Sequence, residues 1–198
     1  MSQSSAQKKL KELVIEYCVS QRAQKLLKLI SRVPKEQRFE LLSAKPGTAL
    51  TEAAYRGHTK FCVTLLRSLP SCDRAKLANG EGKSTAVHQA ANRGHWKTLS
   101  AILSCLKTEE QLQLLFCQDE SGETALHHAA RDGNIDTVRA LLGFLKPEQQ
   151  LKLLSVQNKS HQSATQVAAE AQHMELEKIL SKSQQKGLSF DCMTSKIR

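Results

Sequence analysis

The chain repeats itself at nearly constant intervals, and this periodicity limits the possible fold more than any other feature. Four related segments begin at Thr48, Thr85, Thr124 and Ser163, at intervals of 37, 39 and 39 residues. A fainter copy begins at Glu12 and lacks the polar residues that open the others. Such a period is typical of arrays in which each unit buries its apolar face against the next. Five such units would cover nearly all of the 198 residues.

Each unit is predicted to form two short amphipathic helices. The opening residue of the best copies is a favourable N-cap, and a pair of alanines follows on the apolar face. Glycine stands where the first helix must end, because it adopts the left-handed backbone cheaply. A second helix then ends on two large aliphatic residues. The structural positions predicted in this way are the caps Thr48, Thr85 and Thr124 and the glycines Gly57, Gly94 and Gly133.

The composition agrees with a helical, intracellular protein. Only 4 Pro and 9 Gly are present, whereas helix-forming residues are plentiful. No apolar run approaches the ~18 residues of a membrane span, and the amino terminus lacks the apolar stretch of a secretory signal. The six cysteines are scattered without a CxxC pair, which favours reduced thiols. We therefore expect a soluble, monomeric, cytoplasmic protein, with the nucleus as a second location.

The third full copy, GETALHHAARDGNIDTVRALL, resembles an ankyrin repeat, whose pattern is G-x-T-P-L-H-x-A-A-x-x-G-H. The resemblance covers residues 48–181 well and 12–47 weakly. It implies an all-α ankyrin-repeat solenoid of about five helix-pair units. The ankyrin period is ~33 residues, whereas these units span 36 to 39. The extra residues form extended inter-repeat segments after Pro34, Pro70 and Pro147, and they predict an added helical turn before each finger loop.

Four regions follow from this alignment. Residues 1–47 are expected to form a degenerate capping repeat, 48–162 three well-formed repeats, 163–182 a carboxy-terminal capping repeat, and 183–198 a flexible tail. A terminal unit has only one neighbour, so we expect both ends of the array to be less stable than its middle.

The resemblance gives His88 and His127 a structural role, in which each bonds the backbone of an adjacent unit. His58 and Cys62 have the spacing of two metal ligands on a helix, but no motif completes the set. No Ser-His-Asp or Cys-His arrangement stands apart from the repeat pattern. The sequence therefore predicts no enzyme, no metal and no cofactor, and it assigns Trp96 to packing.

The expected function is that of an adaptor that binds a protein partner, an acidic or extended peptide segment, through the concave groove and the finger loops. Arg56, Arg93 and Arg131 recur at two adjacent repeat positions, so we expect them to form a basic ladder. The alternative is that they pair with nearby acids such as Glu52 and Asp132. The predicted groove residues are Tyr55, Arg56, Asn92, Arg93, Arg131 and Asp132. The predicted finger residues are Glu81, Lys83, Gln118, Glu120, Ser121, Asn158 and Lys159.

The net charge of +10 suggests a second kind of partner. Residues 1–47 contain ten Lys or Arg and four acids, which is the largest basic excess along the chain. A basic face of this kind can bind nucleic acid or an anionic membrane. Docking through Lys- and Arg-rich helices at 8–38 therefore stays open as the alternative function. The cations concerned are Lys8, Lys9, Lys11, Arg22, Lys25, Lys28, Arg32, Lys35 and Arg38.

Overall fold

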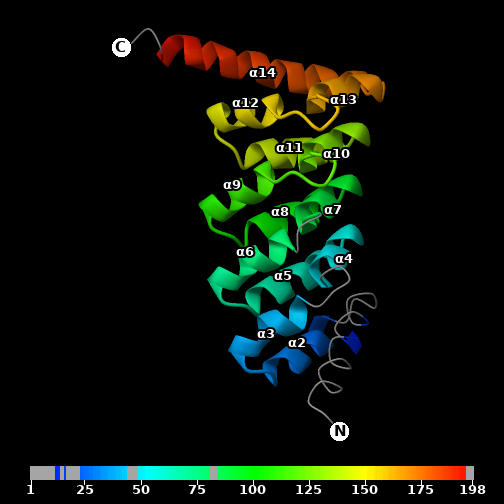
Figure 1. Cartoon of the computed structure of the whole chain (residues 1–198), viewed down its shortest axis with the longest axis vertical. Helices are drawn as coiled ribbons and strands as arrows, with labels where there is room; N and C mark the ends of the chain where they lie inside the picture. The colour runs from blue at the N-terminus through cyan, green and yellow to red at the C-terminus, as the bar shows by residue number, and fades with distance from the viewer. Residues whose placement is uncertain (1–11, 14–15, 17–22, 44–48, 81–83, 195–198) are drawn as a thin grey trace.

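The computed structural model describes residues 12, 13, 16, 23–43, 49–80 and 84–194. These residues form an array of stacked helices that runs from α2 at one end to α14 at the other (Figure 1). The described residues contain no β-strand, and a single bridge joins Gln157 to Ser163. The prediction of an all-α solenoid is confirmed. The cap predicted at Thr48 and the finger residues Glu81 and Lys83 lie outside the described residues.

Each complete unit contains three helices, which stack in three columns (Figure 1). The first helices are α4 (Ala49–Tyr55), α7 (Ala86–Asn92), α10 (Ala125–Arg131) and α13 (Ala164–Glu170). The second helices are α2 (Ala23–Ser31), α5 (Thr59–Arg67), α8 (Trp96–Leu103), α11 (Ile135–Gly143) and α14 (Met174–Thr194). The third helices are α3 (Lys35–Leu42), α6 (Ser71–Asn79), α9 (Thr108–Phe116) and α12 (Pro147–Ser155). The extra residues of each unit thus form a whole helix rather than the single added turn expected.

One boundary differs from that expected at the carboxy-terminal end. Sequence analysis separated a capping repeat at 163–182 from a tail at 183–198, but α14 continues through this boundary to Thr194. No proline or glycine interrupts residues 174–186, so nothing ends the helix at the expected boundary, and it continues through Gly187. Leu176 and Leu180 are buried, so the first half of α14 closes the apolar end of the array.

The core is a continuous row of small and large aliphatic side chains. The alanine pairs of α4, α7 and α10 are fully buried, which lets the first helices of successive units pack closely. The aliphatic pairs that end the second helices are buried beside them, for example Leu65 with Leu66 and Ile102 with Leu103. A single unit would leave both its alanine pair and its aliphatic pair exposed to water, so the units fold by stacking.

The glycines that end the first helices are required for two separate reasons. Gly57, Gly94 and Gly133 have φ of 72°, 68° and 69°, a backbone conformation that side chains disfavour. A Cβ at Gly133 would also lie 2.7 Å from the His173 ring of the next unit, and the other two glycines are covered in the same way. Each glycine therefore ends its own helix and makes room for the following unit.

The third helices connect neighbouring units through two arginines. The Nε of Arg74 donates to Leu69 O (3.1 Å) in its own unit, and Nη1 donates to Cys105 O (3.4 Å) in the next. Arg38 makes the equivalent bonds to Val33 O and Ser68 O, both at 3.0 Å. Because these carbonyls follow the carboxy-terminal ends of second helices, each guanidinium also lies at the negative end of a helix dipole.

Trp96 is not part of the core, contrary to the assignment from sequence. It is 40% exposed at the beginning of α8. The core side of α8 is instead formed by Thr98, Leu99, Ile102 and Leu103, all of which are buried. Trp96 occupies the unit position that Thr59 fills in the preceding unit, and the Thr59 side chain is also only partly buried.

Replacing Gly133 with Val is expected to destabilise the array. The left-handed backbone alone costs a β-branched residue about 1–2 kcal/mol, and the new side chain would displace His173. Thermal or urea unfolding measures the change. The matched control is Gly143→Ala, because Gly143 has no positive φ and its added Cβ would meet no atom within 4 Å. An unchanged melting temperature for Gly133→Val would contradict this explanation of the helix end.

Candidate protein-binding surface

A hollow of about 650 Å³ lies at the carboxy-terminal ends of α4 and α7 and the turns that follow α4, α7 and α10. We call it the groove. Its position follows from the repeat, because α4, α7 and α10 are each followed by a helix-ending glycine and expose the two residues before it. The residues that line the groove are Tyr55, Arg56, His58, Asn92, Arg93, His95, Asp132 and Asn134. Five of the predicted groove residues are therefore brought together here, whereas Arg131 lies elsewhere.

Arg93 is the most available cation of the groove. Its guanidinium lies over the Tyr55 ring, 4.3 Å from the ring centroid, and the two residues come from consecutive units. Arg93 is exposed and makes no ion pair with any residue in the described part of the chain. Stacking on an aromatic ring orients the guanidinium and leaves its N–H edge available for a carboxylate.

The other two arginines of the expected ladder are already paired, so a free basic ladder does not form. Arg56 pairs with Glu52 one helical turn earlier. Arg131 binds Glu123 with both terminal nitrogens, and Nη1 lies 2.7 Å from Oε2. The residue that follows Arg56 and Arg93 at the same unit position is Asp132, which adds an acid to the groove.

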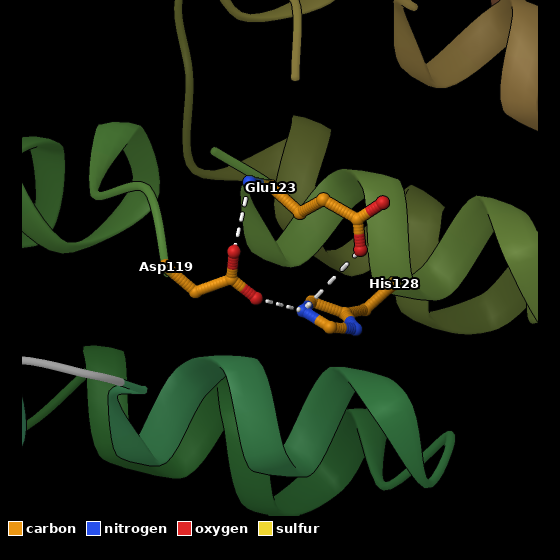
Figure 2. A group of neighbouring side chains, drawn as sticks. All are labelled: Asp119, Glu123 and His128. Atoms are coloured by element: carbon orange, nitrogen blue, oxygen red, sulfur yellow. Dashed lines mark hydrogen bonds and ion pairs between the residues drawn. The ribbon is translucent and has the colours of Figure 1, made fainter. Parts of the chain in front are cut away.

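The partner of Arg131 belongs to a polar cluster at the base of one finger (Figure 2). Asp119 accepts hydrogen bonds from the backbone N–H groups of Ser121 (2.8 Å) and Glu123 (2.9 Å). Its second oxygen lies 2.8 Å from His128 Nε2, and Glu123 Oε2 lies 3.8 Å from the same nitrogen. These contacts fix the finger on the first turns of α10.

The pairing of the cluster's carboxylates decides whether it could hold a metal. Burial raises the pKa of Asp119 and of Glu123, but the hydrogen bonds from the Glu123 backbone and His128 to Asp119, and from Arg131 to Glu123, outweigh it. Both carboxyl groups therefore have pKa values below their ordinary range. Asp119, Glu123 and His128 have ligand atoms within 4.8 Å of one another. Because Arg131 already neutralises Glu123, we assign this cluster to structure.

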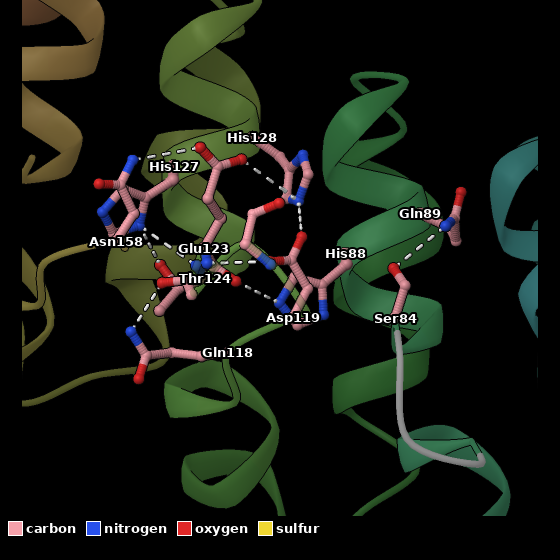
Figure 3. Close-up of polar contacts among 12 residues, drawn as sticks. Ser84, His88, Gln89, Gln118, Asp119, Glu123, Thr124, His127, His128 and Asn158 are labelled. Carbon is pink, nitrogen blue, oxygen red and sulfur yellow. Dashed lines mark hydrogen bonds and ion pairs between the residues drawn. The ribbon is translucent and has the colours of Figure 1, made fainter. Parts of the chain in front are cut away.

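The two predicted structural histidines connect successive units (Figure 3). The Thr85 backbone N–H donates to His88 Nδ1 (3.2 Å), and the Nε2 of His88 lies 3.1 Å from Glu123 O in the next unit. His127 repeats this arrangement with Thr124 and with Gln162 O, at 3.2 and 3.1 Å. A carbonyl oxygen only accepts, so Nε2 carries the proton in both rings. Burial is the main cause that lowers the pKa of both histidines.

The predicted finger residues divide into two groups. Glu120, Ser121 and Lys159 have exposed side chains at the finger tips, and Lys159 N donates to Ser121 O (3.0 Å) across neighbouring fingers. Two others serve the array itself. Asn158 is only 8% exposed and donates to Glu123 (3.3 Å), while the Gln118 amide donates to Gln157 O (2.9 Å) in the next finger.

Sequence reasoning missed the roles of Glu123 and His128. Glu123 is 4% exposed, although it stands in a finger where charged residues are usually solvated. One signal was available in the sequence: Glu123 directly precedes the cap Thr124, and Arg131 follows eight residues later in the same unit. The pattern gave no indication that the two side chains turn toward each other.

The basic amino-terminal surface is described only in part. Lys25, Lys28 and Arg32 are exposed on and just after α2, whereas Lys8, Lys9, Lys11 and Arg22 lie outside the described residues. Arg38 is engaged with backbone carbonyls and belongs to the connections between units.

Comparison with known families agrees with this geometry. The family model for ankyrin repeats matches residues 50–152 and 106–192, with 3 copies. The chain therefore belongs to the ankyrin-repeat family, whose repeats generally mediate protein–protein interaction. No curated protein matches the chain. No helix in the part of the chain that the structure describes is long and apolar enough to cross a membrane.

Replacing both His88 and His127 with Gln is expected to reduce the dependence of stability on pH. An unfolded histidine has a pKa of about 6.5, and burial lowers the pKa of both residues in the folded state. Below that pH the unfolded chain binds more protons, so the wild-type free energy of unfolding falls from pH 7 toward pH 5. Gln166 already occupies the equivalent position beside Ser163, where its Oε1 accepts from Ser163 N (2.8 Å). Urea unfolding at several pH values tests this, and equal slopes for both proteins would contradict it.

Proposed function

We propose that this protein is a non-catalytic adaptor that binds an extended, acidic or mixed segment of a partner protein in the groove. Family membership supports binding in general, because ankyrin repeats generally mediate protein–protein interaction. The choice of the groove rests on its volume of about 650 Å³ and on its residues, which come from three consecutive units. A surface that spans several units suits an extended segment.

The observation that carries this proposal is the Arg93 guanidinium held over the Tyr55 ring. Most arginines lose conformational entropy when they bind a carboxylate, but the ring already restricts this one. Arg and Tyr are also the residue types that most often dominate binding energies at protein interfaces. A partner carboxylate placed against Arg93 would form a bidentate pair at the centre of the groove.

The remaining groove residues favour a mixed partner over a purely acidic one. Asn92 and Asn134 offer amide groups that both donate and accept, and Asp132 would repel a second carboxylate at its end of the groove. Arg56 has a 43% exposed side chain although it pairs with Glu52, so it can contribute a rim contact. We infer a segment whose acid lies opposite Arg93 and whose polar or basic groups lie toward Asp132.

The free thiols support a reducing compartment for this adaptor. Cys72, Cys105 and Cys117 are free. We infer that the protein acts as a monomer in the cytoplasm, with the nucleus as the second location. Docking of nucleic acid or an anionic membrane on Lys25, Lys28 and Arg32 is the competing function.

Replacing Arg93 with Glu is expected to weaken partner binding at least tenfold, because a central interface arginine typically contributes about 2 kcal/mol or more. Helicity and melting temperature should stay close to wild type, since the side chain is exposed. Lys152→Glu is the matched control, because it makes the same charge change at an exposed position on α12. The measurement is retention of lysate proteins on the immobilised variants, quantified beside wild type.

A second set of variants separates the two functions. If binding survives Arg93→Glu but is lost when Lys25, Lys28 and Arg32 are changed to Gln, the basic surface is the working one and the groove proposal is wrong. Docking on that surface would also weaken steeply with added salt.

A further inference from the structure

Trp96 is a large aromatic side chain that the stack leaves exposed. It is 40% exposed, and the Lys97 ammonium lies 5.5 Å from its ring centroid. Trp96 is the only tryptophan of the chain. It begins α8 and lines neither the groove nor any finger contact. Neither the fold nor the proposed function uses this side chain.

A second hollow, of about 440 Å³, lies beside Trp96 between α8 and α11. We call it the outer hollow. Trp96 and Phe144 both line the outer hollow. Arg139, on α11, lines it as well. None of its lining residues belongs to a first helix or to a finger, so it shares no residue with the groove.

Gly143 lines the outer hollow, and the fold gives no reason for a glycine there. It has no positive φ, and a Cβ built on it would meet no atom within 4 Å. Glycine is also poorly suited to a helix, and Gly143 is the last residue of α11. The equivalent residues of the two preceding units are Ser104 and Arg67. The glycine therefore keeps space open at the wall of the hollow, which is useful where another chain approaches closely.

The surface around the outer hollow is basic. Arg139 and Asp136 line the hollow, and Lys97 lies beside the Trp96 ring; all three side chains are exposed. Two cations thus accompany a single acid. Lys97 and Arg139 make no ion pair with the residues that the structure describes. Such a surface complements an acidic partner and repels a basic one.

We propose that the outer hollow is a second docking site, which takes an acidic segment of a partner protein that carries one bulky apolar side chain. The apolar side chain enters between Trp96 and Phe144 beside Gly143, and carboxylates next to it pair with Arg139 and Lys97. Burial of an exposed tryptophan and pairing of free cations would then occur together. Because the two hollows share no residue, the protein can hold two segments at once.

The test starts from a random 12-residue peptide library without tryptophan, displayed on phage and selected on the wild-type protein. Only peptides that are also enriched on Arg93→Glu are kept, which removes those that bind in the groove. The recovered peptides are expected to place two or more Asp or Glu beside a Phe, Leu or Ile. Titration of such a peptide should shift the emission of Trp96, the single tryptophan, to shorter wavelength as the indole leaves water.

Variants of the protein then locate the site. Affinity should fall at least tenfold for Gly143→Gln and Arg139→Glu and stay unchanged for Arg93→Glu and Lys152→Glu. Gly143→Gln adds a side chain into open space on a helix, so its melting temperature should not drop below that of wild type. Arg93→Glu separates this proposal from the groove, since it removes groove binding alone.

Three results would overturn the proposal. The first is a selection that enriches no peptide, or enriches peptides without acidic residues. The second is a peptide that binds without changing the emission of Trp96, or that binds Gly143→Gln as well as wild type. The third is a shift of Trp96 emission on vesicles of 30% phosphatidylserine while the acidic peptides give none, which would make this surface a membrane contact.

Discussion

No unit of this chain can pair all of its backbone hydrogen-bonding groups or bury its apolar face by itself. The following unit provides both the hydrogen-bond partners and the apolar contacts. His88 shows the polar side of this dependence: its Nδ1 accepts from the cap of its own helix, while its Nε2 bonds Glu123 O of the next unit. Arg74 connects two units in the same way at the opposite edge. The buried alanine pairs show the apolar side, because they lie on first helices that pack against the first helices of neighbouring units. Stability therefore depends on nearest neighbours along the array.

The carboxy-terminal unit shows which residues this dependence requires. Gln166 replaces the bonding histidine and keeps only the contact to its own cap, Ser163. Gln172 has φ of 61° at the position of the helix-ending glycines, and His161 has φ of 59° where the preceding finger has Gly122. Both side chains are exposed, whereas a Cβ at Gly122 would lie 2.9 Å from Lys159 N of the next finger. Where no first helix or finger packs against the unit, side chains replace the glycines.

The sequence predicted the parts of the fold that repeat and missed the parts that occur once. Caps, glycines and buried alanines recur at a fixed interval, so the periodicity revealed the stacked array. The third helix of each unit was expected only as an added turn, because its apolar residues are too few to indicate a length.

The pairing of Arg131 with the buried Glu123 depends on side-chain directions that no repeat pattern contains. The sequence placed Arg93 among the groove residues, but its stacking on Tyr55 is a contact between two units that no single repeat contains. The repeat pattern also did not predict that Trp96 is exposed, because only the structure shows which side of α8 faces the core.

Native-state hydrogen exchange of the wild-type protein tests nearest-neighbour stabilisation most directly. Among the described residues, an inner unit has a neighbouring unit on each side, whereas the units of α2 and α3 at one end and of α13 and α14 at the other have one on a single side. The account predicts the slowest exchange in α7, α8, α10 and α11, with protection falling toward both ends of the array. Protection of α2, α3, α13 and α14 equal to that of residues 85–142 would contradict it.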